Sequence, residues 1–238
     1  MPTAIRFLAR LITKSSSTNL PGMTAKLYTY WRSSAAYRVR IALNFKGLDY
    51  ESVPVSLAPG DNEHRQDDYR AINPQMLVPF FDDGKVAIGQ SMAILEYLEE
   101  RYPEVPLLPA TEPLRSKVRA FCNIIACDIH PLNNLRVLNY MSNELGATGE
   151  QKSTWYSHWI AEGFQAAEQI SVSYAHAGPF TFGKDVTLAD ALLVPQMYNA
   201  RRFKMPLDEY PRLVAVADAC NELQSFKDAT PENQPDCN

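Results

Sequence analysis

The sequence predicts an α+β protein in which a small layered domain precedes an all-helical domain. Strand and helix signals alternate as β-α-β-α-β-β-α over about 80 residues, the size of a small domain. A proline-rich segment, EVPLLPATEP, follows, and from Leu114 onward the apolar residues keep a helical spacing. We therefore expect a layered domain at 24–106 and a helical domain at 112–236.

The first 22 residues differ from the rest of the chain. They carry Arg6, Arg10 and Lys14, several serines and no acidic residue. Organelle transit peptides have this character. A disordered leader, with translation possible from Met23, explains the segment equally well. We expect a disordered leader at 1–22 and leave it out of the fold.

Composition excludes several classes of protein. The net charge is −4, so a basic nucleic-acid footprint is not expected. No apolar run approaches the roughly 20 residues that span a bilayer. Cys122, Cys127, Cys220 and Cys237 fit neither a disulfide framework nor a metal site. We expect no metal, no membrane partner and a reducing, cytoplasmic location.

The layered domain opens with a strand and a helix. Lys26–Trp31 is short, aromatic and free of breakers, which predicts a strand. The residues AAYRVRIALNFKG then show helical apolar spacing. Ser33 or Ser34 is suited to cap the start of this helix, and Gly47 its end.

The next elements are a strand and an irregular helix. Tyr50–Val55 reads as a strand. Pro54 within it cannot donate a hydrogen bond, so this strand should lie at an edge of the sheet. Asp61–Arg70 is polar and predicts an irregular helix.

A hairpin and a helix close the domain. Val78–Asp82 and Lys85–Ile88 flank Asp83-Gly84, which predicts a two-residue hairpin turn. Ser91 is suited to cap the helix that follows, which should end before Pro103.

The second half reads as helices. Thr187-Leu188-Ala189-Asp190 has the spacing of a capping box with Asp in place of Glu, so we give Asp190 a structural role. The periodicity predicts helices at Leu114–Ile129, Asn134–Asn143, Glu150–Ala175, Leu188–Phe203 and Leu213–Ser225.

The turn at Ser33-Ser34 has the chemistry of an anion site. A helix start presents free amides and partial positive charge, and two hydroxyls add hydrogen-bond donors. The turn offers no nucleophile of its own, so a ligand thiolate is a good candidate. Lowering a thiol pKa by about two units takes about 2.7 kcal/mol. One hydrogen bond to a charged group supplies about 1.5–3 kcal/mol towards that requirement. On the pattern alone, an ordinary serine cap is the better explanation of the pair, because serine caps are common.

Two further features suit a peptide-like ligand. A cis Val78-Pro79 bond would leave the Val78 backbone open for pairing, although few X-Pro bonds are cis. Gln90-Ser91 stands at a helix start and can donate to a carboxylate. An ordinary cap also explains Ser91.

Several motifs together resemble one known family. YWRSSAAYRVRIAL, NPQMLVP, QSMAILEYLEERYP, DIHPLNNLRVL and TLADALLVPQMYNARRF are similar to the zeta class of glutathione transferases. Within that class they look like bacterial maleylacetoacetate and maleylpyruvate isomerases. The resemblance runs from about Lys26 to Asp236.

The resemblance implies a thioredoxin-like first domain, a helical second domain, a homodimer and glutathione as cofactor. It implies that Ser33 and Ser34 face the glutathione sulfur and are the catalytic pair. The residues it places around the remainder of glutathione are Arg38, His64, Val78, Gln90, Ser91, His130, Asn134 and Arg136.

The family reaction isomerises a cis-dienoic acid: glutathione adds to the double bond, the bond rotates, and glutathione leaves. The dicarboxylate substrate needs cations, for which we name Arg32 and Arg202 because arginine binds carboxylates in a bidentate manner. Arg201 reads as a surface or ion-paired residue. Many members have Ser-Ser-Cys at the turn, whereas this chain has Ala35, which puts any cysteine-dependent activity in doubt.

Three functions fit these observations. The first is maleylacetoacetate isomerisation, with maleylpyruvate as the alternative substrate. The second is conjugation of glutathione to electrophilic halo-acids, which consumes glutathione. The third is a non-enzymatic scaffold, against which the presence of Ser33, Pro79, Gln90 and Ser91 argues.

Overall fold

The computed structural model describes residues 24–237 of the 238-residue chain, so the expected leader at 1–22 lies outside the described residues. The first part is a four-stranded sheet in the order β2-β1-β3-β4. β1 pairs parallel to β2 and antiparallel to β3, and β3 pairs antiparallel to β4. The strands are β1 (Ala25–Thr29), β2 (Tyr50–Pro54), β3 (Phe80–Asp82) and β4 (Ala87–Gly89).

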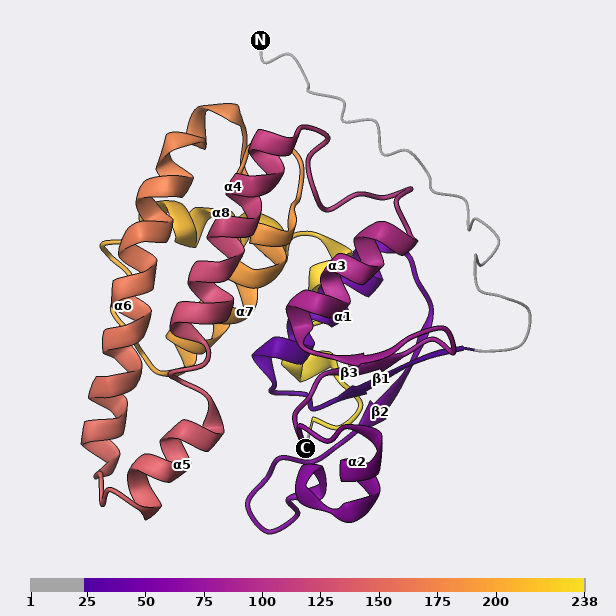
Figure 1. Cartoon of the computed structure of the whole chain (residues 1–238). Helices are drawn as coiled ribbons and strands as arrows, with labels where there is room; N and C mark the ends of the chain where they lie inside the picture. Colours follow the sequence, from indigo (N-terminus) through magenta and orange to yellow (C-terminus); the bar gives the residue numbers. More distant parts are fainter. Residues whose placement is uncertain (1–23, 238) are drawn as a thin grey trace.

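Helices of the first part pack beside this sheet. α1 (Ser34–Lys46) and α3 (Ser91–Arg101) lie together on one face of it, and the short α2 (Asp67–Ile72) lies below (Figure 1). A 3-10 turn, Glu63–Arg65, precedes α2. The edge position predicted from Pro54 is confirmed, because β2 ends the sheet.

Local signals set the ends of α1 as predicted. The Ser33 hydroxyl accepts a hydrogen bond from the Ala36 amide at 3.2 Å, which makes Ser33 the cap. Gly47 ends the helix with φ 68°, a left-handed conformation that costs glycine little. The Ser33-Ser34 turn is therefore held between a strand and a capped helix.

Two local predictions were wrong. The loop between β3 and β4 has four residues, because Asp82 pairs with Ala87. The Asp83 carboxylate accepts from the amides of Lys85 and Val86, which stabilises the longer turn. Ser91 does not cap α3: it is the first helical residue, and its hydroxyl accepts from Arg38 instead.

The second part is helical. Its longest helix, α6, runs antiparallel past α4, and α7 lies between these helices and α1 (Figure 1). The predicted helix at 114–129 continues as a π-helix after α4. The elements are α4 (Glu112–Asn123), the π-helix η2 (Ile124–Ile129), α5 (Leu135–Asn143), α6 (Gly149–Ser173), α7 (Leu188–Arg202), α8 (Pro211–Asn221), α9 (Gln224–Lys227), and 3-10 turns at Ala175–Ala177 and Pro231–Asn233.

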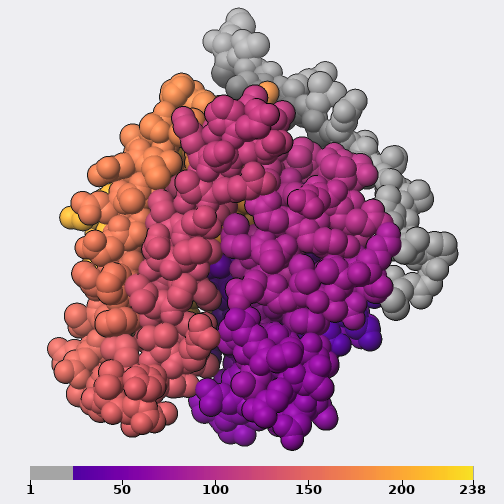
Figure 2. All heavy atoms as spheres, viewed as in Figure 1, coloured from indigo at the N-terminus to yellow at the C-terminus, as the bar shows by residue number. Residues whose placement is uncertain are grey.

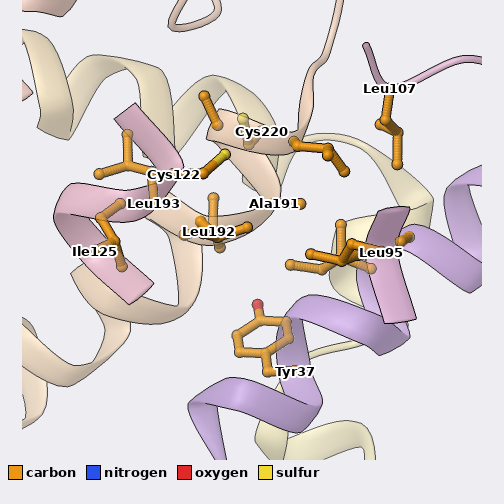
Figure 3. Packing of buried hydrophobic residues seen from close by; sticks show 14 of the residues in the cluster. Tyr37, Leu95, Leu107, Cys122, Ile125, Ala191, Leu192, Leu193 and Cys220 are labelled. Carbon is orange, nitrogen blue, oxygen red and sulfur yellow. The ribbon is translucent and has the colours of Figure 1, made fainter. Parts of the chain in front are cut away.

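One apolar core joins the two parts. Figure 3 shows Tyr37 of α1 and Leu95 of α3 close to Cys122 and Leu192 of the helical part. All four side chains are at most 2% exposed. Burial of this shared apolar surface fixes how the halves sit against each other.

Asp190 stabilises the start of α7 as its spacing predicted. Its fully buried carboxylate accepts from the amides and hydroxyls of both Thr181 and Thr187, at 2.7–3.1 Å. Burial nevertheless raises its pKa, and these four bonds oppose that shift. Asp190 lines neither cavity described below, in keeping with a structural role.

The four cysteines are free thiols, and Cys122 and Cys220 are buried. Within residues 24–237, no helix is long and apolar enough to cross a membrane.

Candidate active site

Two adjoining cavities lie between the two parts of the chain. The larger has a volume of about 690 Å³ and the smaller about 120 Å³. In Figure 2 the violet first part meets the pink helical part along a seam on the visible face. Residues 30–78 line one side of the larger cavity and residues 130–203 the other.

All twelve predicted site residues line these cavities. Arg32, Ser33, Ser34, His64 and Arg202 line the larger one, and Arg38, Gln90 and Ser91 the smaller. Val78, His130, Asn134 and Arg136 line both. The fold therefore brings together residues that span 171 positions of the sequence, from Arg32 to Arg202.

Ser33 keeps a donor although it caps α1. The Ser33 amide donates to the Tyr30 carbonyl at 2.9 Å, which closes the turn. The hydroxyl oxygen accepts from Ala36, so its own proton is still free to donate. A cap and a thiolate donor are thus compatible functions of one hydroxyl.

Ser34 is paired with a histidine. Its hydroxyl lies 3.2 Å from Nδ1 of His130, which follows the π-helix directly. Burial, and then the charges of Arg38 and Arg136, lower the pKa of His130 to about 3. The imidazole is therefore neutral at pH 7. Because Ser34 shares its hydrogen bond with this ring, Ser33 is the less committed donor.

Arg38 places a buried cation behind the smaller cavity. It is 1% exposed, and its Nη1 donates to the Ser91 hydroxyl at 3.2 Å. Its Nε and Nη2 have no hydrogen-bond partner among the described residues. Burial lowers its pKa to about 10, so it remains charged at pH 7. A buried cation with free donors favours a bound anion.

The smaller cavity also has polar groups from two loops. The Val78-Pro79 bond is cis, as the family resemblance implied. The Leu77 carbonyl beside it accepts from the Tyr69 hydroxyl and the Asn73 amide, both at 2.7 Å. Gln90 donates to the Gln75 side chain at 2.7 Å across the same cavity. These bonds fix the loop at the start of β3.

The larger cavity is strongly cationic. Within the described residues, no aspartate or glutamate lines it. Its basic lining consists of Arg32, Arg65, Arg70, Arg136, Arg202, His64 and His130. In a chain of net charge −4, this concentration of cations indicates an anion site.

The two arginines predicted to bind substrate are held by aromatic rings. The guanidinium of Arg32 lies 5.0 Å from the Trp31 ring centre, and that of Arg202 lies 4.5 Å from that of Phe203. Neither forms a salt bridge within the part of the chain that the structure covers. Their charges are thus available to a ligand.

Arg201 differs from its neighbour. It donates to Asp218 at 2.7 Å, and both side chains are exposed. The prediction that Arg201 is an ion-paired surface residue is confirmed.

Sequence reasoning missed part of the cavity wall. Arg65 and Arg70 belong to the polar segment that was read only as irregular helix. Asn199 lines the cavity one turn before Arg202, a spacing that could have identified it. Tyr156 comes from α6 and stacks on Phe203 at 3.7 Å, a contact that no local pattern signals.

Comparison with known proteins decides the family. A model described as glutathione S-transferase, N-terminal domain, matches residues 27–106. Maleylacetoacetate isomerase of Pseudomonas aeruginosa is 48% identical over 89% of this chain and 98% of its own. The chain belongs to the zeta class of the glutathione transferases. A solved bacterial maleyl pyruvate isomerase of that class is 46% identical with a TM-score of 0.87, covering 90% of this chain and 100% of its own.

A further relative has ligands in its active site. Maleylacetoacetate isomerase from Anaeromyxobacter dehalogenans is 40% identical with a TM-score of 0.79, covering 92% of this chain and 96% of its own. It was solved with dicarboxyethyl glutathione and citrate bound. In this zeta-class chain, Ala35 faces the smaller cavity and contributes no thiol.

Proposed function

We propose that the chain is a glutathione-dependent cis–trans isomerase that converts maleylacetoacetate to fumarylacetoacetate. The observation that carries the proposal is the cavity of about 690 Å³ beside the Ser33 turn, which the described residues line with five arginines and no acidic side chain. Its volume suits a small-molecule site. The bound ligands of the Anaeromyxobacter relative, a glutathione derivative and a tricarboxylic acid, agree in charge with this lining.

The residues present fit glutathione. Its carboxylates need hydrogen-bond donors. The Arg38 guanidinium bonds Ser91 through Nη1, while its Nε and Nη2 have no partner among the described residues and can donate to a carboxylate. When bound, glutathione supplies the thiolate that adds reversibly to the cis double bond of the substrate. Ser33 and the free amides of α1 would hold the sulfur as an anion. Val78, Gln90 and Ser91 would hold the peptide.

Other residues would complete the peptide site. His64 is 7% exposed and faces the larger cavity, with its Nδ1 3.4 Å from the Ser56 carbonyl. Asn134 uses its side-chain oxygen to accept from the Arg136 amide at 3.0 Å, which leaves its NH₂ group to donate. We assign His64, Asn134 and Arg136 to the part of glutathione beyond its cysteine.

The substrate is a dianion, and the arginines would bind it. Arg32 and Arg202 come from opposite sides of the cavity, and within residues 24–237 neither forms a salt bridge. Each can take one carboxylate in a bidentate manner. Thiolate addition spreads negative charge over the carbonyl end of the substrate, and fixed cations stabilise that charge as it develops.

The experiment that tests this proposal follows substrate absorbance for maleylacetoacetate and maleylpyruvate, with and without glutathione. We expect turnover of maleylacetoacetate only when glutathione is present, with glutathione recovered unchanged. Faster turnover of maleylpyruvate would show that maleylpyruvate is the preferred substrate instead. Stoichiometric loss of glutathione with halo-acids and no isomerisation would instead establish a conjugating transferase.

We further propose that the enzyme is a homodimer that works in the cytoplasm. The family resemblance supports the dimer, and the four free thiols suit a reducing compartment. Light scattering after gel filtration measures the assembly, and a monomer at micromolar concentration would contradict it.

A further inference from the structure

The end of the chain lies against the turn that carries Arg32 and Ser33. In Figure 1 the yellow C-terminal segment runs back beside the sheet and the start of α1. The Asp236 carboxylate accepts from the Trp31 amide through Oδ2 at 2.9 Å. This bond joins residues 205 positions apart, immediately before the catalytic turn.

A buried arginine reinforces this contact. Arg40 is 0% exposed and donates to the Trp31 carbonyl at 3.0 Å and the Ala229 carbonyl at 3.1 Å. It also donates to the Thr29 hydroxyl at 3.1 Å. The peptide units on both sides of Trp31 are thereby tied to the C-terminal segment, the carbonyl through Arg40 and the amide through Asp236.

Within residues 24–237, the Asp236 side chain makes one hydrogen bond, the one to the Trp31 amide. Its second oxygen, Oδ1, is buried and has no hydrogen-bond partner among the described residues. Its negative charge is one of those that favour the charged form of Arg40, while burial lowers the Arg40 pKa to about 10. A carboxylate oxygen that is buried and accepts no hydrogen bond from the described residues carries a cost in stability, which suggests a functional reason.

The C-terminal segment is itself ordered by local bonds. The Gln234 amide donates to the carbonyls of Asp228 and Thr230 at 2.9 and 2.8 Å. Glu232 accepts from the Tyr198 hydroxyl of α7 at 2.6 Å, one turn from Arg202. The segment thus contacts both elements that carry the proposed substrate arginines.

We propose that residues 229–236 form a strap in which Asp236 is a positioning residue for the Arg32-Ser33 turn. By fixing the Trp31 peptide, Asp236 orients the Ser33 hydroxyl toward the glutathione sulfur and the Arg32 guanidinium toward the substrate. This inference rests on the proposed function for its chemistry. The strap itself, however, is a property of the fold and is measurable without turnover.

The test compares Asp236→Ala and Asp236→Asn with the wild type. Alanine removes the acceptor, whereas asparagine keeps a side-chain oxygen that can accept from the Trp31 amide. Asp228→Ala is the matched control: Asp228 is exposed just before the strap, and among the described residues its carboxylate accepts only from Gln224. Alanine keeps the carbonyl that accepts from Gln234. Thermal unfolding of each variant reports whether the fold is kept.

Two readouts separate the strap from the reaction. Hydrogen exchange at the Trp31 amide, by NMR, tests the contact in the absence of any ligand. Ultraviolet titration of the thiolate in the glutathione complex tests its effect on Ser33. We expect faster exchange and a thiol pKa raised by about one unit in Asp236→Ala, which leaves about tenfold less thiolate below that pKa. Asp236→Asn should restore both, and Asp228→Ala should change neither.

Other results overturn the inference. Unchanged Trp31 exchange in Asp236→Ala would show that no strap exists. Faster exchange with an unchanged thiol pKa would show a strap that does not position the turn. Failure of asparagine to rescue would contradict the hydrogen-bond role. If the wild type binds glutathione but does not isomerise, the proposed function fails while both readouts still decide this inference.

Discussion

At the scale of single residues, Ser33 combines a structural bond with a free donor. Its oxygen accepts from the Ala36 amide, and its proton remains available at the cavity wall. Ser34 shares its hydrogen bond with His130. The two adjacent serines therefore differ in what they can offer a thiolate.

Ser33→Ala is expected to remove one charge-assisted hydrogen bond from the thiolate. Such a bond contributes about 1.5–3 kcal/mol, so kcat/KM should fall roughly 10- to 150-fold. The thiol pKa of bound glutathione, followed by its ultraviolet absorbance, should rise in parallel. Ser34→Ala is the matched control, and a larger effect there than at Ser33 would reverse the assignment.

Arg32→Ala and Arg202→Ala should weaken substrate use and spare glutathione binding. Each removes one carboxylate contact, for which a loss of about 10- to 100-fold in kcat/KM is expected, mostly through KM. Calorimetric glutathione affinity should change by less than about threefold, the equivalent of about 0.7 kcal/mol. Arg201→Ala, which removes only an exposed ion pair, is the control. Loss of glutathione affinity in the first two variants would refute their role.

His130 makes stability depend on pH. Its pKa is about 3 in the folded chain against an ordinary 6.5, so the unfolded chain binds more protons between these values. The stability that neutral His130 contributes is complete above about pH 6.5 and is lost as pH falls from there towards about 3. We expect the free energy of unfolding to fall by on the order of 1–2 kcal/mol more between pH 8 and pH 5 in the wild type than in His130→Asn.

Denaturant unfolding at the two pH values measures this difference. His176→Asn serves as the control, because His176 lies exposed on a 3-10 turn outside both cavities. An identical pH response in the wild type and His130→Asn would show that His130 is not held neutral.

At the scale of elements, the site is assembled from helix ends. Ser33 precedes α1, Ser91 begins α3, His130 follows the π-helix and Arg202 ends α7. Helix starts bring free amides and partial positive charge to the cavity. The long central stretches of these helices supply the core instead.

A buried ion pair anchors the segment between the two parts. Lys46 at the end of α1 pairs with Glu99 of α3, and their side chains are 1% and 9% exposed. Lys46 also donates to the carbonyls of Tyr102 and Val105, and Glu99 accepts from the Leu107 amide. The pair therefore joins two helices to the linker.

Lys46→Ala leaves the Glu99 carboxylate buried without its cation. We expect a loss of about 3–5 kcal/mol in the free energy of unfolding, measured by urea titration. Lys227→Ala breaks an exposed pair with Glu222, and a loss below about 1 kcal/mol is expected. Equal losses in the two variants would contradict the anchoring role.

At the scale of the whole molecule, the site exists only because the two parts share a core. Residues from both parts line the larger cavity, and Tyr37, Leu95, Cys122 and Leu192 belong to one apolar core (Figure 3). The strap at 229–236 adds a second connection on the outer side. Geometry at the cavity thus depends on contacts distant in sequence.

Sequence predicted what short-range chemistry controls. The Ser33 cap, the Gly47 stop and the edge position of β2 follow from one residue and its neighbours. The hairpin length was wrong because the Asp83 carboxylate bonds two amides and stabilises a longer turn. The Ser91 cap was wrong because its partner, Arg38, lies 53 positions away.

The site residues needed more than spacing. The family resemblance named ten of them, and the charge of the expected substrate added Arg32 and Arg202. All twelve line the two cavities, but their roles stay predictions. Arg65 was missed because its polar segment was read only as irregular helix, and Asn199 was missed although it stands one turn before Arg202. Tyr156 was missed because it reaches the cavity from α6, which no local pattern signals. The Asp236 contact with Trp31 spans 205 positions, and no local pattern could reveal it.

We propose that the thiolate of bound glutathione, held at Ser33, isomerises a dicarboxylate in the arginine-lined cavity. The most direct measurement is the rate of maleylacetoacetate conversion at increasing glutathione concentration, with product and glutathione both quantified. The account predicts a rate that is zero without glutathione, saturates with it, and leaves its amount unchanged. Conversion that proceeds equally without glutathione, or that consumes one glutathione per turnover, would contradict it.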